Sequence, residues 1–131
     1  MSAFEIIPSW DRAATIVRVV DGDTVDVDID LGFEIRIQMR VRVYGINCPE
    51  SRSSDERERE LGKQAKAFAE QLLPAGKMVA LRSHKEAGSD RYGRYLAEIL
   101  VPVDRVDFAA AMVAAGHAKI WFGHGPKPTW D

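Results

Sequence analysis

The feature that most constrains the fold of this chain is an alternation of apolar and charged residues with a period of two. It runs from Ala14 to Val43 and is typical of β-strands with one buried face. We divide it into three predicted strands. The second alternates aliphatic residues with Asp26, Asp28 and Asp30, and the third alternates them with arginine and glutamine. A turn at 31–33 that contains a glycine is expected to join these two strands.

The charges on the predicted hairpin have a plain structural interpretation. Opposite charges that face each other across two strands on a solvated surface contribute about 0.2–1 kcal/mol per pair. We therefore expect the aspartates of the second strand to pair with Arg36 and Arg40 of the third. The preceding segment Asp21-Gly22-Asp23-Thr24 has turn composition and is predicted to close the first hairpin.

After Pro49 the periodicity becomes that of a helix. One apolar stripe is formed by Leu61, Ala65, Phe68, Ala69 and Leu72. Ser53 and Glu56 have the spacing of a capping box, and Pro74 ends the segment.

Two more strands are predicted at Met78–Arg82 and Tyr95–Val101, and a second helix from about Asp104 to Ala115. The inward side of that second helix is predicted to consist of Val106, Ala110, Val113 and Ala114. Gly116 stands at the position that commonly follows a helix.

This order of elements predicts a mainly β fold with helices. It is the order of a five-stranded OB-fold Greek-key barrel with a helix between strands 3 and 4 and a second helix after strand 5. A length of 131 residues is ordinary for one domain. We expect a single domain over 1–131, with a core of about 14–122 and an irregular tail at 123–131.

Composition excludes several classes of protein. Eighteen Lys and Arg against 20 Asp and Glu give a net charge of -2, so a polyanion must be met by a local basic cluster. The single Cys48 excludes a disulfide framework and a multi-thiolate zinc site. No apolar stretch approaches the roughly 20 residues that span a bilayer, so no membrane partner is expected. Without a visible signal peptide we expect a cytoplasmic location by default, with export by another route still open.

Three clusters carry acidic oxygens, arginines or both to strand ends or adjoining loops. They are Asp21–Thr24, Arg42–Glu50 and Asp90–Arg94. Phosphodiester cleavage needs a hard cation held by oxygens, a base near the attacking water and fixed positive charge for the transition state. It also needs a way to stabilise the leaving oxygen. Together the three clusters contain residue types that can supply all four.

In this order, interleaved with the expected helices, the clusters resemble the staphylococcal nuclease (thermonuclease) family over roughly Ala14 to Trp121. The resemblance implies an OB-fold, calcium-dependent phosphodiesterase that hydrolyses DNA and/or RNA with little sequence preference. It implies that Glu50 is the general base on the attacking water. Arg42 and Arg94 would bind and stabilise the phosphate, a task that suits the bidentate guanidinium group.

For the metal, the resemblance implies Asp23, Asn47 and the backbone carbonyl of Cys48 as calcium ligands, with Asp21 just behind them. The family normally has aspartate in place of Asn47. An amide oxygen is still a hard donor. However, two unit charges ~4 Å apart at an effective dielectric of ~20 interact by about 4 kcal/mol, so replacing the aspartate charge weakens the attraction for the cation. We therefore expect the calcium affinity to be lower by roughly one to three orders of magnitude.

The resemblance also implies partners. Arg91 and Tyr92 match positions near the substrate phosphate and base, and the expected substrate is DNA and/or RNA, with single strands favoured. Well-known family members carry a further helix beyond the position of Trp121. Here we expect the tail with Trp130, a protein partner or self-association to cover that surface.

A second hypothesis stays open, namely a catalytically weak or inactive nuclease-like OB-fold module that binds nucleic acid or protein. Asn47 favours it, whereas the joint presence of Arg42, Glu50 and Arg94 favours the enzyme. A sugar-binding or purely structural barrel would make that joint presence a coincidence. Binding that weakens steeply with salt distinguishes a nucleic-acid module from a protein-only module.

Overall fold

The computed structural model describes residues 11–84, 95–102 and 104–130. The strands are β1 (Asp11–Asp21), β2 (Thr24–Gly32), β3 (Ile35–Val43), β4 (Ile46–Asn47), β5 (Met78–Ser83), β6 (Tyr95–Val101), β7 (Val106–Asp107) and β8 (Lys119–Ile120). The helices are α1 (Glu56–Leu72) and α2 (Phe108–Ala114). In this part of the chain neither helix combines the length and the apolar character needed to cross a membrane.

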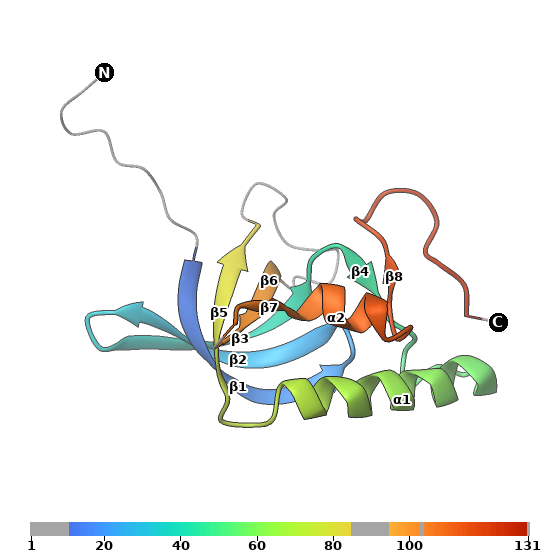
Figure 1. Cartoon of the computed structure of the whole chain (residues 1–131), viewed down its shortest axis with the longest axis horizontal. Coiled ribbons are helices and arrows are strands. Elements are labelled where there is room, and N and C mark those ends of the chain that lie inside the picture. The colour runs from blue at the N-terminus through green and yellow to red at the C-terminus, as the bar shows by residue number, and fades with distance from the viewer. Residues whose placement is uncertain (1–10, 85–94, 103, 131) are drawn as a thin grey trace, which may run out of the picture.

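The strands form a closed barrel (Figure 1). The main sheet has the order β3-β2-β1-β5-β6-β7, and β3 also pairs in parallel with β6 through residues 41–43 and 95–97. This second pairing closes the ring of five strands β3-β2-β1-β5-β6. Helix α1 lies between β4 and β5 in the chain, and α2 follows β7. The predicted fold class is therefore confirmed, a mainly β barrel of the OB type with two helices.

The barrel is filled by the inward side of the alternating strands. Val25 and Val27 of β2 and Val41 of β3 are almost completely buried. Ala65 and Ala69 of α1 are also buried, and their small side chains allow the helix to lie close to the strands. Burial of these apolar groups is the main favourable contribution to folding.

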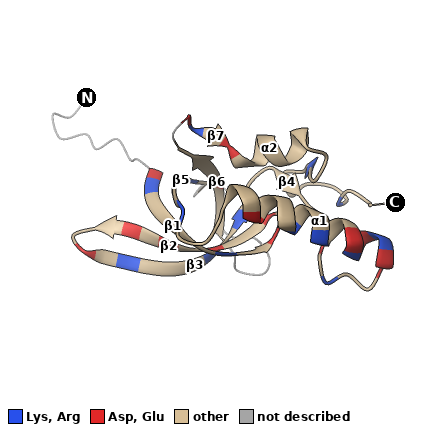
Figure 2. Cartoon of the chain, turned by 60° about the horizontal axis from the view of Figure 1, so that its bottom comes forward, with Lys and Arg blue, Asp and Glu red and all other residues tan. Residues whose placement is uncertain are grey.

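The acidic and basic strands pair as predicted (Figure 2). Arg40 Nε of β3 lies 2.8 Å from Asp26 Oδ1 of β2, and Arg36 Nε lies 3.1 Å from Asp28 Oδ2. Arg18 of β1 adds a second partner for Asp26 at 2.8 Å. Near the barrel the alternate residues Val25, Val27 and Val41 face the core, whereas Leu31, Ile35 and Ile37 toward the end of the hairpin are exposed.

The turn between β2 and β3 differs from the prediction of a turn at 31–33. Gly32 still pairs with Ile35, so the connecting residues are Phe33 and Glu34. Their φ angles are 54° and 64°. Positive φ at both central residues is what a two-residue type I′ turn requires. The glycine marks the end of β2 and precedes the turn, with a φ of 81°. The ladder pairing sets this register, and composition alone does not reveal it.

Both predicted helix starts need correction. Asp55 caps α1 by accepting a hydrogen bond from the Glu58 N–H, whereas the Ser53 hydroxyl accepts from the Asp55 N–H. Asp107 caps α2, which therefore starts at Phe108 and not near Asp104. Residues 106–107 pair with β6 as a short strand instead.

The inward side of α2 was also predicted wrongly. Phe108 and Met112 are buried, while Val113 is partly buried against the core. Val106, Ala110 and Ala114 are exposed. The start of the helix after the Asp107 cap rotates its buried side, and in an alanine-rich segment the large side chains decide which side faces inward.

A first prediction concerns Asp26. Its hydrogen bond to Arg40 lowers its pKa from the ordinary value; burial opposes this shift, and Arg18 adds to it. Because the pKa is lower in the folded state, the contribution to stability is complete above the ordinary aspartate range and is lost as pH falls through the folded pKa. We expect Asp26→Asn to reduce the free energy of unfolding by about 1 kcal/mol near pH 7.

Urea denaturation at about pH 7 and about pH 3 measures this effect. The difference between Asp26→Asn and the unmodified protein should shrink at the lower pH. Asp104→Asn is the matched control, because Asp104 is exposed and has no ion pair within the described residues. An equal difference at both pH values would contradict the argument.

Candidate functional site

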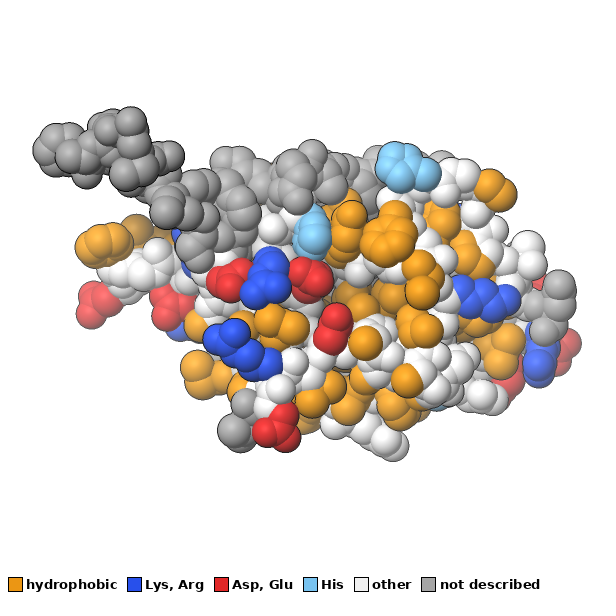
Figure 3. All heavy atoms as spheres, turned by 45° about the horizontal axis from the view of Figure 1, so that its top comes forward, with side chains coloured by type: hydrophobic (Ala, Val, Ile, Leu, Met, Phe, Trp, Pro, Cys, Tyr) orange, Lys and Arg blue, Asp and Glu red, His pale blue; other side chains and the backbone are white. Residues whose placement is uncertain are grey.

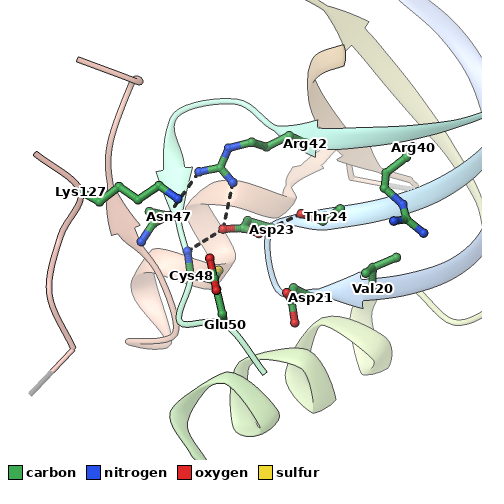
Figure 4. A pocket seen from close by; sticks show the side chains of 10 residues that line it. All are labelled: Val20, Asp21, Asp23, Thr24, Arg40, Arg42, Asn47, Cys48, Glu50 and Lys127. Atoms are coloured by element: carbon green, nitrogen blue, oxygen red, sulfur yellow. Dashed lines mark hydrogen bonds and ion pairs between the residues drawn. The ribbon is translucent and has the colours of Figure 1, made fainter. Parts of the chain in front are cut away.

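A cavity of about 300 Å³ lies where the β1–β2 turn, the end of β3, strand β4 and the C-terminal tail meet (Figure 4). Its lining consists of Val20, Asp21, Asp23, Thr24, Arg40, Arg42, Asn47, Cys48, Glu50 and Lys127. Six of the residues predicted from sequence are thus brought together here. The other three, Arg91, Tyr92 and Arg94, lie outside the described residues.

The Asp23 side chain has three polar partners around the cavity. Its Oδ2 accepts the Cys48 N–H at 2.8 Å and lies 3.1 Å from Arg42 Nη1. Its Oδ1 accepts the Thr24 hydroxyl at 3.0 Å. The Asp23 backbone oxygen also accepts the Val43 N–H at 2.9 Å. One residue of the β1–β2 turn therefore connects β3 with the segment that follows β4.

Arg42 is buried, with an exposed fraction of 6%. Besides the Asp23 carboxylate, its guanidinium group donates from Nη2 to the Ile46 carbonyl at 3.0 Å and to Asn47 Oδ1 at 3.4 Å. The guanidinium carbon lies 5.6 Å from the centre of the Trp121 ring. A buried cation needs such partners, because an unpaired one would be strongly destabilising. The positive charge at this wall of the cavity is consequently fixed in orientation.

The backbone of Glu50 is held by two hydrogen bonds, while its carboxylate has no partner among the described residues. Its N–H donates to Glu58 Oε2 of α1 at 3.1 Å, and its carbonyl accepts the Ser53 N–H at 3.2 Å. The carboxylate points into the cavity (Figure 4). Within the described ranges it has no hydrogen-bond or ion-pair partner. A positioned carboxylate without a partner can accept a proton.

Asp21 is tied to the residue that follows Glu50. Its Oδ1 accepts hydrogen bonds from both the N–H and the hydroxyl group of Ser51. The β1–β2 turn and the loop before α1 are therefore joined twice, through Asp21 and through Asp23. This arrangement fixes the distance between the acidic groups of the cavity.

The oxygen donors of the cavity suit a hard cation by their chemistry. The Asp23 carboxylate, the Asn47 amide and the Cys48 carbonyl are the kinds of ligand that calcium takes. Across the described part of the chain, however, no group of three or more His, Cys, Asp or Glu side chains is arranged to hold a metal. A metal site here therefore depends on the neutral oxygens of Asn47 and Cys48, and Asp23 would have to serve it while paired with Arg42.

Sequence reasoning missed the residues that support this site. Gly62 of α1 packs on the backbone of Glu50 and Ser51, where an added Cβ would lie 2.5 Å from backbone atoms. A glycine in the interior of a predicted helix was a signal that could have indicated this contact. Lys127 and Ser51 gave no signal, because a single lysine or serine in a loop has no pattern.

The tail continues from β8 without helix or strand through residues 121–130. Lys119 donates to the Thr129 carbonyl at 2.7 Å, and its ammonium lies 4.6 Å from the centre of the Trp130 ring. The tail therefore packs back on β8. Whether the tail, a partner or a second copy covers the surface beyond Trp121 stays a prediction.

A closed five-stranded barrel with acidic and arginine side chains gathered at its strand ends defines a nuclease-like OB-fold domain. The family model described as staphylococcal nuclease homologue matches residues 40–129, which is more than half of the chain. The chain belongs to this family, and the resemblance seen in the sequence is confirmed. The matched range contains Arg42, Asn47 and Glu50, and it begins after the turn that carries Asp21 and Asp23.

A second prediction concerns Gly62. In Gly62→Ala the methyl group would meet backbone atoms of Glu50 and Ser51, which cannot move aside as a flexible side chain would. We expect a loss of about 1–3 kcal/mol in unfolding free energy, although alanine favours a helix by about 1 kcal/mol. Urea denaturation measures it, with Lys63→Ala at the exposed neighbouring position as control. A Gly62→Ala protein of undiminished stability would refute the close contact.

A third prediction concerns the thiol of Cys48, which is 2% exposed. Burial raises its pKa from the ordinary value, and the nearby charge of Asp23 adds to the shift. The reactive thiolate is therefore disfavoured at neutral pH. We expect an aromatic disulfide reagent to leave the folded protein unlabelled and to react fully with the protein in concentrated urea, as absorbance will show. Rapid labelling of the folded protein would contradict this.

Proposed function

We propose that this protein is a metal-dependent nuclease that hydrolyses DNA and/or RNA with little sequence preference. The observation that carries the proposal is the partnerless carboxylate of Glu50, which faces the same cavity as the buried Asp23–Arg42 pair. A base and a fixed positive charge on one cavity are two of the four things that hydrolysis of a phosphodiester requires. Membership of the nuclease homologue family supports the same reaction class.

In this proposal Glu50 takes a proton from the attacking water, whose oxygen bonds to phosphorus. The P–O bond to the leaving strand then breaks, and the departing oxygen takes a proton from solvent water. Its backbone is held by Glu58 and by the contact with Gly62, so the side chain starts from a fixed point beside the cavity. Arg42 stabilises the negative charge that grows on the phosphate. Three protein partners fix the guanidinium, so little reorganisation is needed during the reaction. Arg94 is proposed as the second phosphate-binding cation.

Asp23, Asn47 and the Cys48 carbonyl would hold calcium. When bound, calcium offsets the negative charge of the phosphate and polarises its oxygens. Because Asn47 contributes no charge and Asp23 is shared with Arg42, we propose a weak site that needs millimolar metal. Arg91 and Tyr92 are proposed to contact the phosphate and the base of a substrate, with single strands favoured.

A second candidate function is a catalytically weak module that binds nucleic acid or protein. The ion pair between Asp23 and Arg42 favours it, because that pair satisfies the carboxylate without any metal. On the face seen in Figure 3, acidic and basic side chains of the described residues are interspersed. Binding of nucleic acid would therefore be local to the cavity and weaken with added salt.

A fourth prediction tests the enzyme. Glu50→Gln keeps the size of the side chain and removes its ability to accept a proton, so we expect cleavage to slow by about 10²–10⁴-fold. Cleavage of a fluorescent single-stranded DNA oligonucleotide is followed with calcium from zero to tens of millimolar. Glu34→Gln, an exposed change in the β2–β3 turn, is the matched control.

The outcomes are distinct. Calcium-dependent cleavage that is lost in Glu50→Gln and kept in Glu34→Gln supports the proposal. Undiminished cleavage by Glu50→Gln shows that another group is the base. A folded protein that binds the oligonucleotide but cleaves nothing at any calcium level is the binding module.

A further inference from the structure

One wall of the cavity comes from outside the barrel. Lys127 belongs to the irregular tail, yet it lines the cavity together with residues of the β1–β2 turn and β4 (Figure 4). The roles proposed above for Glu50, Arg42 and the oxygen donors leave this lysine unexplained. Its position adds a positive charge to the lining of the cavity.

The tail holds Lys127 in this place. On one side of it, the Lys119 ammonium bonds to the Thr129 carbonyl at 2.7 Å and lies against the Trp130 ring at 4.6 Å. Lys127 itself stands between Pro126 and Pro128, and each proline ring fixes one backbone angle. A segment restricted in this way loses less conformational entropy when its lysine binds a ligand.

The surroundings of the Lys127 ammonium favour an anion. It lies 5.8 Å from the centre of the Trp121 ring, the same ring that the Arg42 guanidinium approaches at 5.6 Å. Arg42 is already paired with Asp23, whereas Lys127 forms no ion pair with a carboxylate of the described residues. The charge of Arg42 is balanced by Asp23, whereas the Lys127 ammonium is a cation on the cavity wall without such a partner in the described part of the chain, so an anionic ligand in the cavity can pair with it.

We propose that Lys127 is a substrate-binding residue that contacts a phosphodiester oxygen of the nucleic-acid strand in the cavity. This inference rests on the proposed function of the same site and assigns it a further cation. The tail brings this charge to the cavity from outside the barrel. Lysine serves here as a point charge and takes no part in proton transfer. Its loss should therefore weaken substrate binding more than it slows the chemical step.

The test uses two substitutions and a control. Lys127→Met keeps the apolar stem and removes the charge, and Lys127→Arg keeps the charge. Lys77→Met is the matched control, because Lys77 is outside the cavity lining. Binding of a fluorescent single-stranded DNA oligonucleotide with a 5′-hydroxyl end is measured by anisotropy without metal at several salt concentrations. KM and kcat are then measured with calcium.

We expect Lys127→Met to raise the dissociation constant and KM about tenfold, as loss of a charge-assisted contact does, with kcat changed less than about twofold. The slope of log affinity against log salt should fall by about 0.7, the value for one phosphate contact on a single strand. Lys127→Arg should restore most of the affinity, and Lys77→Met should change neither quantity.

Several results would overturn the inference. Unchanged binding and KM in Lys127→Met, with cleavage still abolished by Glu50→Gln, would remove Lys127 from the site and leave the nuclease proposal intact. Tighter binding, or a lower calcium requirement, would show that the lysine competes with a cation. Another such result is that Lys127→Met weakens binding of a 5′-phosphorylated oligonucleotide and leaves binding of the 5′-hydroxyl oligonucleotide unchanged. That result would assign Lys127 to a terminal phosphate and overturn the phosphodiester assignment. Absence of both oligonucleotide binding and calcium-dependent cleavage in the unmodified protein would overturn both proposals.

The inference about Lys127 can also hold where the nuclease proposal fails. If the unmodified protein binds the oligonucleotide but does not cleave it, and Lys127→Met weakens that binding with the smaller salt slope, the role of Lys127 is supported while the nuclease proposal fails.

Discussion

The buried ion pair between Asp23 and Arg42 is the interaction on which the site depends. It joins the β1–β2 turn to β3, and through the Cys48 N–H it also holds the segment after β4. Both side chains are less than one tenth exposed. Removing either partner would leave an uncompensated buried charge, which typically destabilises a protein by about 3–5 kcal/mol. The same pair that holds three segments together therefore presents charge of both signs to the cavity.

Helix α1 plays a comparable part for Glu50. The absence of a side chain at Gly62 lets the helix touch the backbone of Glu50 and Ser51, and Glu58 accepts the Glu50 N–H. Asp21 holds Ser51 from the other side. The carboxylate is thus supported by a rigid backbone while it keeps no partner among the described side chains. Such support from neighbouring groups is what keeps a reactive group in position.

The parts of the fold that were predicted correctly are those that depend on residues close together in the chain. The period-two pattern of β2 and β3 follows directly from one buried face, so their strands and their Asp26–Arg40 pairing were predictable. The cap of α1 was not, because Ser53 and Asp55 both have capping side chains and only the path of the chain selects one. The inward side of α2 depended on where Asp107 starts the helix.

The sequence by itself determined the fold class, the family and the residue types of the site, since these follow from periodicity, from the order of the elements and from short motifs. The pairing of residues 41–43 with 95–97, which closes the barrel, is tertiary. Tertiary structure alone decided that Asp23 pairs with Arg42, that Gly62 supports Glu50 and that Lys127 faces the cavity. These contacts join segments far apart in the chain. Their geometry is fixed only when barrel closure and burial bring the segments together, and no periodic signal records it beforehand.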